Sequence, residues 1–370
     1  MIGIITCTKE CNLRCKYCFE EKNFKTHSRV DVESINSRFR KAIPLIKKFC
    51  YELMEYNQTH NLRNEFTFHG GEPLLVLPIY IDEVCKYVRE LDKSAKFNVQ
   101  TNGTIITDEF INIFVKYDFL VGISVDGGQE THDENRVDIL GKGTHNLVMK
   151  NIHKLREAGI RIGAMATITR GISQDAATFY KFYKDNSLNL GFNACYTSPD
   201  SINPNNKLDD TQYCKFLKEL FDIWSNDKMA HISIRPFERI IRNIVCPSHG
   251  MEVCQFIKDC RGVNIAIDLN GKIYHCLHYV NLENGSIGSL KTESLKSIIE
   301  RYMSMPSHWE HMQTQRCNEC DIYNFCYGGC PYYSDAFQIT QLEFDFNCNS
   351  QKFITHYIYQ KLLEQINKNH

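Results

Sequence analysis

The chain has 370 residues, enough for one large domain or two ordinary ones with a sizeable core. Lys and Arg number 43 and Asp and Glu 44, so no bulk charge would draw the protein onto nucleic acid or an anionic membrane. We therefore expect neither as a partner. No signal-peptide pattern is present, and no apolar run approaches the roughly 20 residues of a membrane span, so the sequence predicts a cytoplasmic protein.

Up to about residue 225, short β-branched or aromatic runs alternate with longer segments of helical period. One such segment carries an apolar stripe from Val32 to Ile46, and another ends just before Gly159, where a helix-terminating glycine is typical. Six β/α units in series indicate a parallel sheet with helical crossovers, either open and doubly wound or curved into a barrel. The strands are expected at residues 2–6, 65–69, 96–100, 120–125, 160–167 and 189–195.

The loop after the first predicted strand contains Cys11, Cys15 and Cys18. A reducing cytoplasm does not maintain structural disulfides, so most of the 17 cysteines in the chain are expected to serve metal binding. Three thiolates are one fewer than a closed zinc site or an ordinary iron–sulfur cluster uses. The fourth position is therefore either filled from elsewhere, by Cys7 or His27 in a zinc site, or left open for a small molecule.

Polar motifs follow the next three predicted strands. GGEP at 70–73 follows the second; its glycines would let the backbone approach a ligand, and Glu72 could accept hydrogen bonds from an ammonium. QTNGT at 100–104 ends the third strand, and SVDG at 124–127 ends the fourth, with Arg136 shortly after. The carboxyl ends of parallel strands form the ligand-binding face of such folds, so these loops and the cysteine loop are expected to meet there. Taken alone, GGEP would be an ordinary turn and Arg136 a surface salt-bridge partner.

After about residue 230 the β/α alternation stops and cysteines become dense. Residues 263–276 alternate apolar residues on either side of Asn270-Gly271, which predicts a hairpin with Cys276 at the end of its second strand. Helices are expected at 292–303 and at about 350–367. The predicted division is residues 1–230, a cysteine-rich part at 231–348, and a final helix at 349–370.

Eight of the nine cysteines in this part form two groups, and their thiolates are enough for two closed four-cysteine sites. Iron–sulfur clusters and structural zinc ions are both compatible with this spacing. The first group is Cys254, Cys260 and Cys276, and the second is Cys317, Cys320, Cys326, Cys330 and Cys348.

Cys-x3-Cys-x2-Cys near the start of a six-unit β/α chain, with Tyr17 directly before the third cysteine, resembles the radical S-adenosylmethionine (SAM) superfamily. The resemblance implies a partial (β/α)6 barrel and a [4Fe-4S] cluster on Cys11, Cys15 and Cys18, whose open iron binds SAM. In that family an electron from the cluster splits SAM into methionine and a 5′-deoxyadenosyl radical, which abstracts hydrogen from the substrate. A one-electron donor such as flavodoxin or ferredoxin is then an expected partner.

The same resemblance implies that the strand-end loops contact SAM. The GGEP segment would hold the amino group, Ser124 the carboxylate or ribose, and Arg136 the carboxylate. The residues expected to bind the cofactor are Tyr17, Gly70, Gly71, Glu72, Asn102, Ser124 and Arg136.

The later cysteines and Gly271 resemble the SPASM extension of radical SAM enzymes. That resemblance implies a small α+β domain with two auxiliary [4Fe-4S] clusters, and three clusters in all. A zinc-bound interaction module without catalysis is the remaining alternative. By the family pattern, the first auxiliary cluster would take Cys254, Cys260, Cys276 and Cys330, and the second Cys317, Cys320, Cys326 and Cys348.

Radical SAM enzymes with this extension include anaerobic sulfatase maturases, which form formylglycine from Cys or Ser, and enzymes that crosslink ribosomally made peptides. Both act on peptide or protein side chains. The sulfatase-maturase pattern has a Tyr, a Gln and an Asp where this chain has Glu20, His69 and Leu277. Leu277 cannot accept the proton that formylglycine formation releases, although Glu20, His69, His275 or His278 could replace that base. We therefore expect thioether or other crosslinking of a ribosomal peptide, with sulfatase maturation as the alternative.

Overall fold

The computed structural model describes residues 1–18, 30–195, 208–246, 259–306, 317, 319–327, 329–330, 332 and 341–368. Glu20, His27 and Cys254 lie outside these residues. The chain forms two compact units. The first comprises Met1–Val125, His132–Ala164 and Arg261–Met305, and the second Asp126–Thr131, Met165–Cys260 and Pro306–His370.

The first unit is built on a parallel sheet, as the sequence predicts. β1 (Ile2–Thr8), β2 (Glu65–Gly70), β3 (Lys96–Thr101) and β4 (Leu120–Ser124) pair in parallel in that order. The first half of β5 (Arg161–Ile168) lies beside β4. Each strand overlaps its predicted range, because buried runs bounded by turn residues identify parallel strands well.

A hairpin from the cysteine-rich part extends this sheet. β7 (Asn264–Ile267) and β8 (Lys272–Tyr274) are antiparallel around Gly271, whose φ of 79° suits a glycine turn, as predicted. β9 (Gly288–Ser289) pairs with β8. β7 also runs parallel to β1, so the order in the first unit is β5-β4-β3-β2-β1-β7-β8-β9. Residues 261–305 thus join the first unit, and the boundary at 230 stays a prediction.

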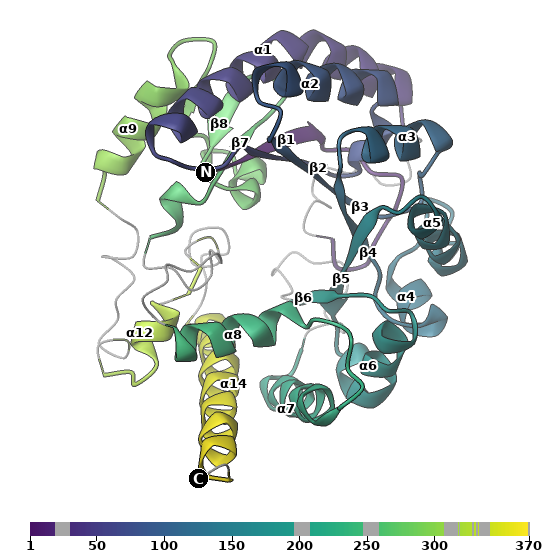
Figure 1. The fold of residues 1–370 in the computed structure, drawn as a ribbon, viewed down its shortest axis with the longest axis vertical. Coiled ribbons are helices and arrows are strands. Elements are labelled where there is room, and N and C mark those ends of the chain that lie inside the picture. The colour runs from purple at the N-terminus through teal and green to yellow at the C-terminus, as the bar shows by residue number, and fades with distance from the viewer. Residues whose placement is uncertain are drawn as a thin grey trace. The chain divides into compact units, whose positions relative to one another are not determined.

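Helices cover one face of this sheet (Figure 1). The N-terminus of α1 is capped by the carboxylate of Asp31, which accepts a hydrogen bond from the backbone N–H of Ser34 at 2.9 Å. Gly159 follows α5 at a φ of 73°, as expected of a glycine after a helix end. The helices of this unit are α1 (Val32–Thr59), α2 (Pro78–Leu91), α3 (Asp108–Lys116), α5 (His145–Glu157) and α9 (Leu295–Ser304).

Side chains alternate between the two faces of the strands. Phe66 and Phe97 stack at 6.4 Å between ring centroids, and Phe97 stacks on Phe119 at 5.5 Å, within the apolar layer beneath the helices. Each buried Phe contributes about 1.5–3 kcal/mol to folding. The opposite face is polar, since Asn98 donates a hydrogen bond to Glu65 at 2.6 Å. The strands therefore direct polar groups to the side away from the helices.

The second unit contains β6 (Leu190–Ala194) beside the second half of β5, and four longer helices. The last helix contacts α7 through Tyr357, whose hydroxyl donates to Asp222 at 2.6 Å. It begins at Gln341, earlier than predicted. These helices are α6 (Ala176–Asp185), α7 (Asp210–Asn226), α8 (Arg235–Val245) and α14 (Gln341–Lys368). The short helix α12 (Tyr323–Cys326) also belongs to this unit, and the short helix α4 (Gln129–Asn135) has residues in both units.

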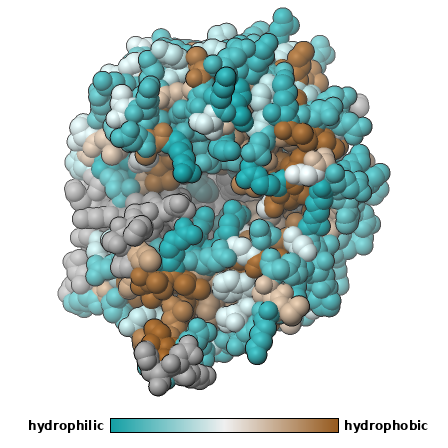
Figure 2. Space-filling view, viewed as in Figure 1, coloured by the Kyte–Doolittle hydropathy of each residue, from teal (hydrophilic) through white to brown (hydrophobic). Residues whose placement is uncertain are grey.

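The visible surface is largely hydrophilic, with hydrophobic residues in smaller patches between hydrophilic ones (Figure 2). Some large apolar side chains, such as Ile79 and Leu140, are exposed, which is usual for a folded domain. Among the helices described, none combines the length and the apolar character that crossing a bilayer would demand.

Candidate functional site

The cysteine loop begins at the carboxyl end of β1. The sulfur of Cys11 accepts a hydrogen bond from the backbone N–H of Leu13 at 3.4 Å, and the Cys18 N–H donates to the Cys15 carbonyl at 3.0 Å. Burial, followed by the charges of Glu72 and Cys15, raises the pKa of the Cys11 thiol to about 12. The thiols of Cys11 and Cys15 therefore lie within electrostatic reach of each other, and all three predicted ligands share one loop.

Backbone bonds fix this loop to the segment after α4. The Arg14 N–H donates to the Val137 carbonyl at 2.7 Å, and the Lys16 N–H donates to the Asn135 carbonyl at 3.0 Å. Two such bonds, one on each side of Cys15, limit how far the cysteine can move.

Tyr17 and Arg136 meet across the same junction. The Arg136 guanidinium lies 5.4 Å from the centroid of the Tyr17 ring, a cation–π distance. Arg136 is only 7% exposed. It is therefore not a surface salt-bridge residue, which was the alternative role for Arg136. Two residues expected to contact SAM are thus held together beside the cysteine loop.

The GGEP loop lies against the start of the cysteine loop. The Gly71 N–H donates to the Thr8 carbonyl at 2.8 Å, and the Glu72 N–H donates to the Glu10 carbonyl at 3.0 Å. A Cβ at Gly70 would lie 2.2 Å from the Thr8 oxygen, and one at Gly71 would lie 2.3 Å from the Glu10 oxygen. The glycines are therefore required because two protein loops approach closely, a reason different from the close approach to a ligand that we expected.

The carboxylate of Glu72 is fully buried and binds protein donors. It accepts hydrogen bonds from the Thr101 hydroxyl at 2.7 Å, the Asn102 N–H at 2.7 Å and the Leu74 N–H at 3.0 Å. Burial raises the pKa of Glu72 to about 7, although these bonds favour the charged form. Its oxygens connect the ends of β2 and β3, and a direct contact with the SAM ammonium stays a prediction.

Ser124 ends β4, and a neighbouring strand orients it. The Gln100 side-chain amide donates to the Ser124 hydroxyl oxygen at 3.2 Å. Gly122 leaves the space for that amide, since a Cβ there would lie 2.3 Å from the Gln100 oxygen. Because the hydroxyl oxygen accepts this bond, its own proton can be donated to another acceptor.

The loops described above lie in a part of the chain that is similar to a known family. The sequence profile of the Radical SAM superfamily matches residues 5–183, which include the cysteine loop, the GGEP loop and the ends of β3 and β4. The chain contains a radical SAM domain. It is an enzyme of the radical SAM type, and a zinc-bound module without catalysis is not supported.

Relatives of this radical SAM enzyme extend over nearly the whole chain. It is 26% identical to a cysteine-type anaerobic sulfatase-maturating enzyme of Clostridium perfringens, over 96% of this chain and 95% of the relative. It is 25% identical to a serine-type enzyme of Bacteroides thetaiotaomicron, over 87% of this chain and 80% of the relative.

Solved structures show the same fold. Native anSMEcpe with bound AdoMet and Cp18Cys peptide has a TM-score of 0.80 at 23% identity, covering 100% of this chain and 99% of that one. Streptococcus suis SuiB bound to S-adenosylmethionine has a TM-score of 0.60 at 16% identity, covering 92% and 75%. The parallel sheet is therefore the partial barrel of radical SAM enzymes, as the resemblance implied.

The segment after the hairpin reaches the same strand-end loops. Cys276 lies just beyond β8 rather than within its end, and it directly precedes the short helix Leu277–Asn281. The Lys9 ammonium, from the loop after β1, donates to the Val280 carbonyl at 2.9 Å. The short helix that begins at Leu277 therefore contacts the loop that leads to the radical SAM cysteines.

Two half-buried histidines lie at this face, and the sequence indicated them only as replacement bases. Burial lowers the pKa of His278 to about 4. Burial also lowers the pKa of His69 to about 4, with a further contribution from the charge of His278, which shows that the two rings are neighbours. The Nδ1 of His69 accepts the Gly70 N–H at 2.7 Å, so the neutral ring carries its proton on Nε2 and presents a donor there.

The second group of cysteines shows one long-range approach. Lys352 pairs with Asp321 at 3.1 Å, and its pKa is raised first by that bond and also by the charges of Cys320 and Cys348. These two thiols, distant in sequence, therefore lie near the same ammonium. In the part of the chain with assigned positions, no three His, Cys, Asp or Glu side chains gather around one ion. A cubane distributes its thiolates over four irons, so its ligands lie farther apart than those of a single ion.

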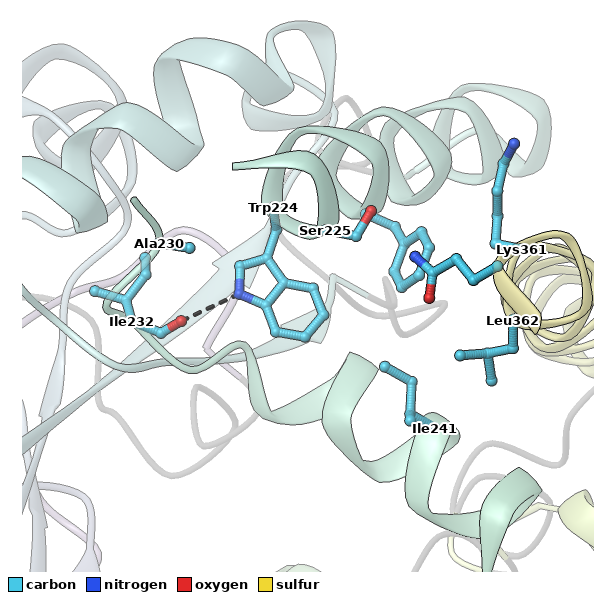
Figure 3. Close-up of a pocket in the computed structure, with 9 residues that line it drawn as sticks. Trp224, Ser225, Ala230, Ile232, Ile241, Lys361 and Leu362 are labelled. Atoms are coloured by element: carbon cyan, nitrogen blue, oxygen red, sulfur yellow. Dashed lines mark hydrogen bonds between the residues drawn. The ribbon is translucent and has the colours of Figure 1, made fainter. Parts of the chain in front are cut away.

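A pocket of about 350 Å³ lies in the second unit (Figure 3). The indole N–H of Trp224 donates to the Ile232 carbonyl at 3.1 Å, while Ile241 and Leu362 line the same space and the Lys361 ammonium points away. The pocket is lined mainly by apolar side chains and contains none of the predicted site residues.

Proposed function

We propose that this radical SAM enzyme is a maturase that oxidises a Cys or Ser side chain of a peptide or protein to an aldehyde. The observation that carries the proposal is similarity along 96% of the chain to a cysteine-type sulfatase-maturating enzyme, and along 87% to a serine-type one. Sequence motifs alone favoured peptide crosslinking, because Leu277 replaces an expected base. Similarity along the whole chain supports the alternative more strongly than that one residue opposes it.

The residues at the strand ends fit the implied cofactors. Cys11, Cys15 and Cys18 share one loop and offer thiolates, the ligands that iron–sulfur clusters take. The buried guanidinium of Arg136 suits a carboxylate, and the hydroxyl of Ser124 retains a proton to donate. When bound, SAM and the cluster would supply one electron and a carbon radical that removes hydrogen from the substrate.

We also propose two auxiliary clusters, on the cysteines that the resemblance groups together, and a small one-electron donor protein as partner. Support for the second auxiliary set is the approach of Cys320 and Cys348 to Lys352. The first set rests on the resemblance, with Cys276 placed just after the hairpin.

A second candidate function is the formation of a thioether or other crosslink in a ribosomally made peptide. The observation that favours it is Leu277, which lies on the strand-end segment and cannot take up a proton. His69 does not restore a base, since its Nδ1 is occupied by the Gly70 N–H and its Nε2 carries the proton. His69 is better suited to donate a hydrogen bond to a substrate oxygen or sulfur.

The products of one assay separate these two functions. The anaerobically reconstituted enzyme is incubated with SAM, a reductant and three matched peptides that carry Cys, Ser or Ala at one position. The proposal predicts an aldehyde on the Cys or Ser peptide, detected by hydrazide trapping and mass spectrometry, with sulfur lost from Cys. A product that keeps its sulfur, loses two hydrogens and does not react with hydrazide would establish crosslinking instead.

A further inference from the structure

Asn102 is the residue at which the ends of β1, β2 and β3 meet. Its side-chain nitrogen lies 3.7 Å from the sulfur of Cys11 and 2.9 Å from the side-chain oxygen of Asn12. Its backbone N–H donates to the buried carboxylate of Glu72 at 2.7 Å. Asn102 itself is 8% exposed. One side chain thus contacts a cysteine of the radical SAM loop while its backbone is fixed to the GGEP loop.

The orientation of the Asn102 amide follows from its other partners. Its side-chain oxygen accepts hydrogen bonds from the backbone N–H of Thr104 at 2.9 Å and from the Thr104 hydroxyl at 2.7 Å. A backbone N–H can only donate, so the amide oxygen must face Thr104. The NH2 group therefore faces Cys11, and the contact is an N–H···S hydrogen bond with the sulfur as acceptor.

Neighbouring contacts fix this arrangement. The Asn12 side-chain nitrogen donates to the Thr104 hydroxyl at 2.9 Å, which closes a ring of hydrogen bonds through Asn102. The Thr101 hydroxyl bonds to the same carboxylate of Glu72 as the Asn102 backbone. Such a network costs little reorganisation when the charge on the sulfur changes.

We propose that Asn102 is a positioning residue that stabilises the reduced state of the cluster on Cys11, Cys15 and Cys18 through its hydrogen bond to the Cys11 sulfur. The inference rests on the proposed cofactors and differs from the SAM contact that the resemblance implied for Asn102. A hydrogen bond to a ligand sulfur stabilises the added negative charge of the reduced cluster and so raises its reduction potential. The chain thereby controls how readily the cluster accepts the electron that SAM cleavage consumes.

Two substitutions remove this donor in different ways. Asn102→Asp keeps the shape and the acceptor for Thr104 but places an oxygen against the sulfur, and Asn102→Ala removes the side chain. Thr104→Val is the matched control, because it disrupts the same ring of hydrogen bonds but keeps the Thr104 N–H that orients the amide. The reduction potential is measured without SAM by redox titration and electron paramagnetic resonance, in the full-length enzyme with its clusters reconstituted. The cluster in question is the one whose signal changes when SAM is added.

In both Asn102 variants, the reduction potential of the SAM-responsive cluster is expected to fall by about 59 mV. For a one-electron couple, this equals about a tenfold fall in the ratio of reduced to oxidised cluster at a fixed potential. Thr104→Val should leave that ratio within about twofold, and the auxiliary signals should not move in any variant. An unchanged potential in both variants, with the cluster present, would overturn the inference. Loss of the cluster from both would overturn it too, because a bond that adjusts the potential is not needed for assembly.

Failure of the proposed function gives a different result. A wild-type protein with no SAM-responsive iron signal would remove the cofactor assignment itself. Weaker SAM binding in the Asn102 variants at an unchanged potential would return Asn102 to the role of a SAM contact.

Discussion

Tyr17 and Arg136 allow a test of how the cysteine loop supports SAM binding. The ring of Tyr17 lies 5.4 Å from the Arg136 guanidinium, and such a pair contributes about 0.5–2 kcal/mol. Replacing the ring by Tyr17→Leu should release Arg136 and raise the dissociation constant of SAM by about 2- to 30-fold. Tyr17→Phe retains the ring and should bind SAM as the wild type does. Equilibrium binding to the reconstituted enzyme measures both, and equal weakening in the two variants would contradict the ring contact.

His132 gives a prediction for the effect of pH on stability. It is fully buried, its Nε2 lies 3.1 Å from the Thr144 hydroxyl, and burial followed by the charge of Arg136 lowers its pKa to about 3. Because the folded state disfavours protonation, stability is complete above the ordinary pKa of about 6.5 and falls as the pH drops below it.

The matching variant is His132→Gln, which keeps a polar partner for Thr144. It should be less stable than the wild type at pH 8, and the gap should shrink by about 2 kcal/mol by pH 5, as the wild type loses its histidine contribution. Urea unfolding at several pH values measures this. Parallel stability curves for the two proteins would show that His132 is not buried in its neutral form.

At the scale of single residues, the sequence identified most of the site but only part of its chemistry. The cysteines, GGEP, Ser124 and Arg136 stand in short motifs whose residue types already indicate ligands. Gln100 and Asn12 were missed as supporting residues, although the QTNGT motif includes the first. Their partners are Ser124 and Asn102, and which side chains meet across strands depends on register, which residue type does not encode.

The approach of the GGEP loop to the loop after β1 is an interaction between elements. A Cβ at Gly71 would lie 2.3 Å from the Glu10 carbonyl oxygen, so Gly71→Ala must push the two loops apart. We expect this variant to lose the iron of the cluster on Cys11, Cys15 and Cys18, which is about four of about twelve iron atoms. The iron of the auxiliary clusters should remain. Gly163→Ala is the control, because nothing lies within 4 Å of a Cβ there. Iron and sulfide analysis measures both, and full iron in Gly71→Ala would contradict the loop contact.

At the scale of elements, the positions of the strands were predicted more accurately than the pairing of strands in the sheet. Short buried runs located β1 to β6, and Asn270-Gly271 located the hairpin. The pairing of β7 with β1 was not predicted, because periodicity says which residues form a strand and not which distant strand it will join. That pairing lies close to the short helix Leu277–Asn281, which contacts the loop after β1 through Val280.

For the whole molecule, the fold could be predicted from the sequence, but the reaction could not. The family was readable because its motifs recur in order along the chain. The sequence motifs favoured crosslinking because of a single position, Leu277, whereas the similarity to a sulfatase-maturating enzyme covers 96% of the chain. A change of one side chain can move a proton acceptor without changing the radical chemistry that the rest of the chain supports.

The measurement that tests the central claim most directly is the formation of 5′-deoxyadenosine from SAM by the reduced, reconstituted enzyme. The account predicts that wild-type protein forms it and that Cys11→Ala does not, while Cys50→Ala, at a buried cysteine of α1 outside the site, forms it as the wild type does. Absence of 5′-deoxyadenosine from a wild-type protein loaded with iron, or its undiminished formation by Cys11→Ala, would contradict the account.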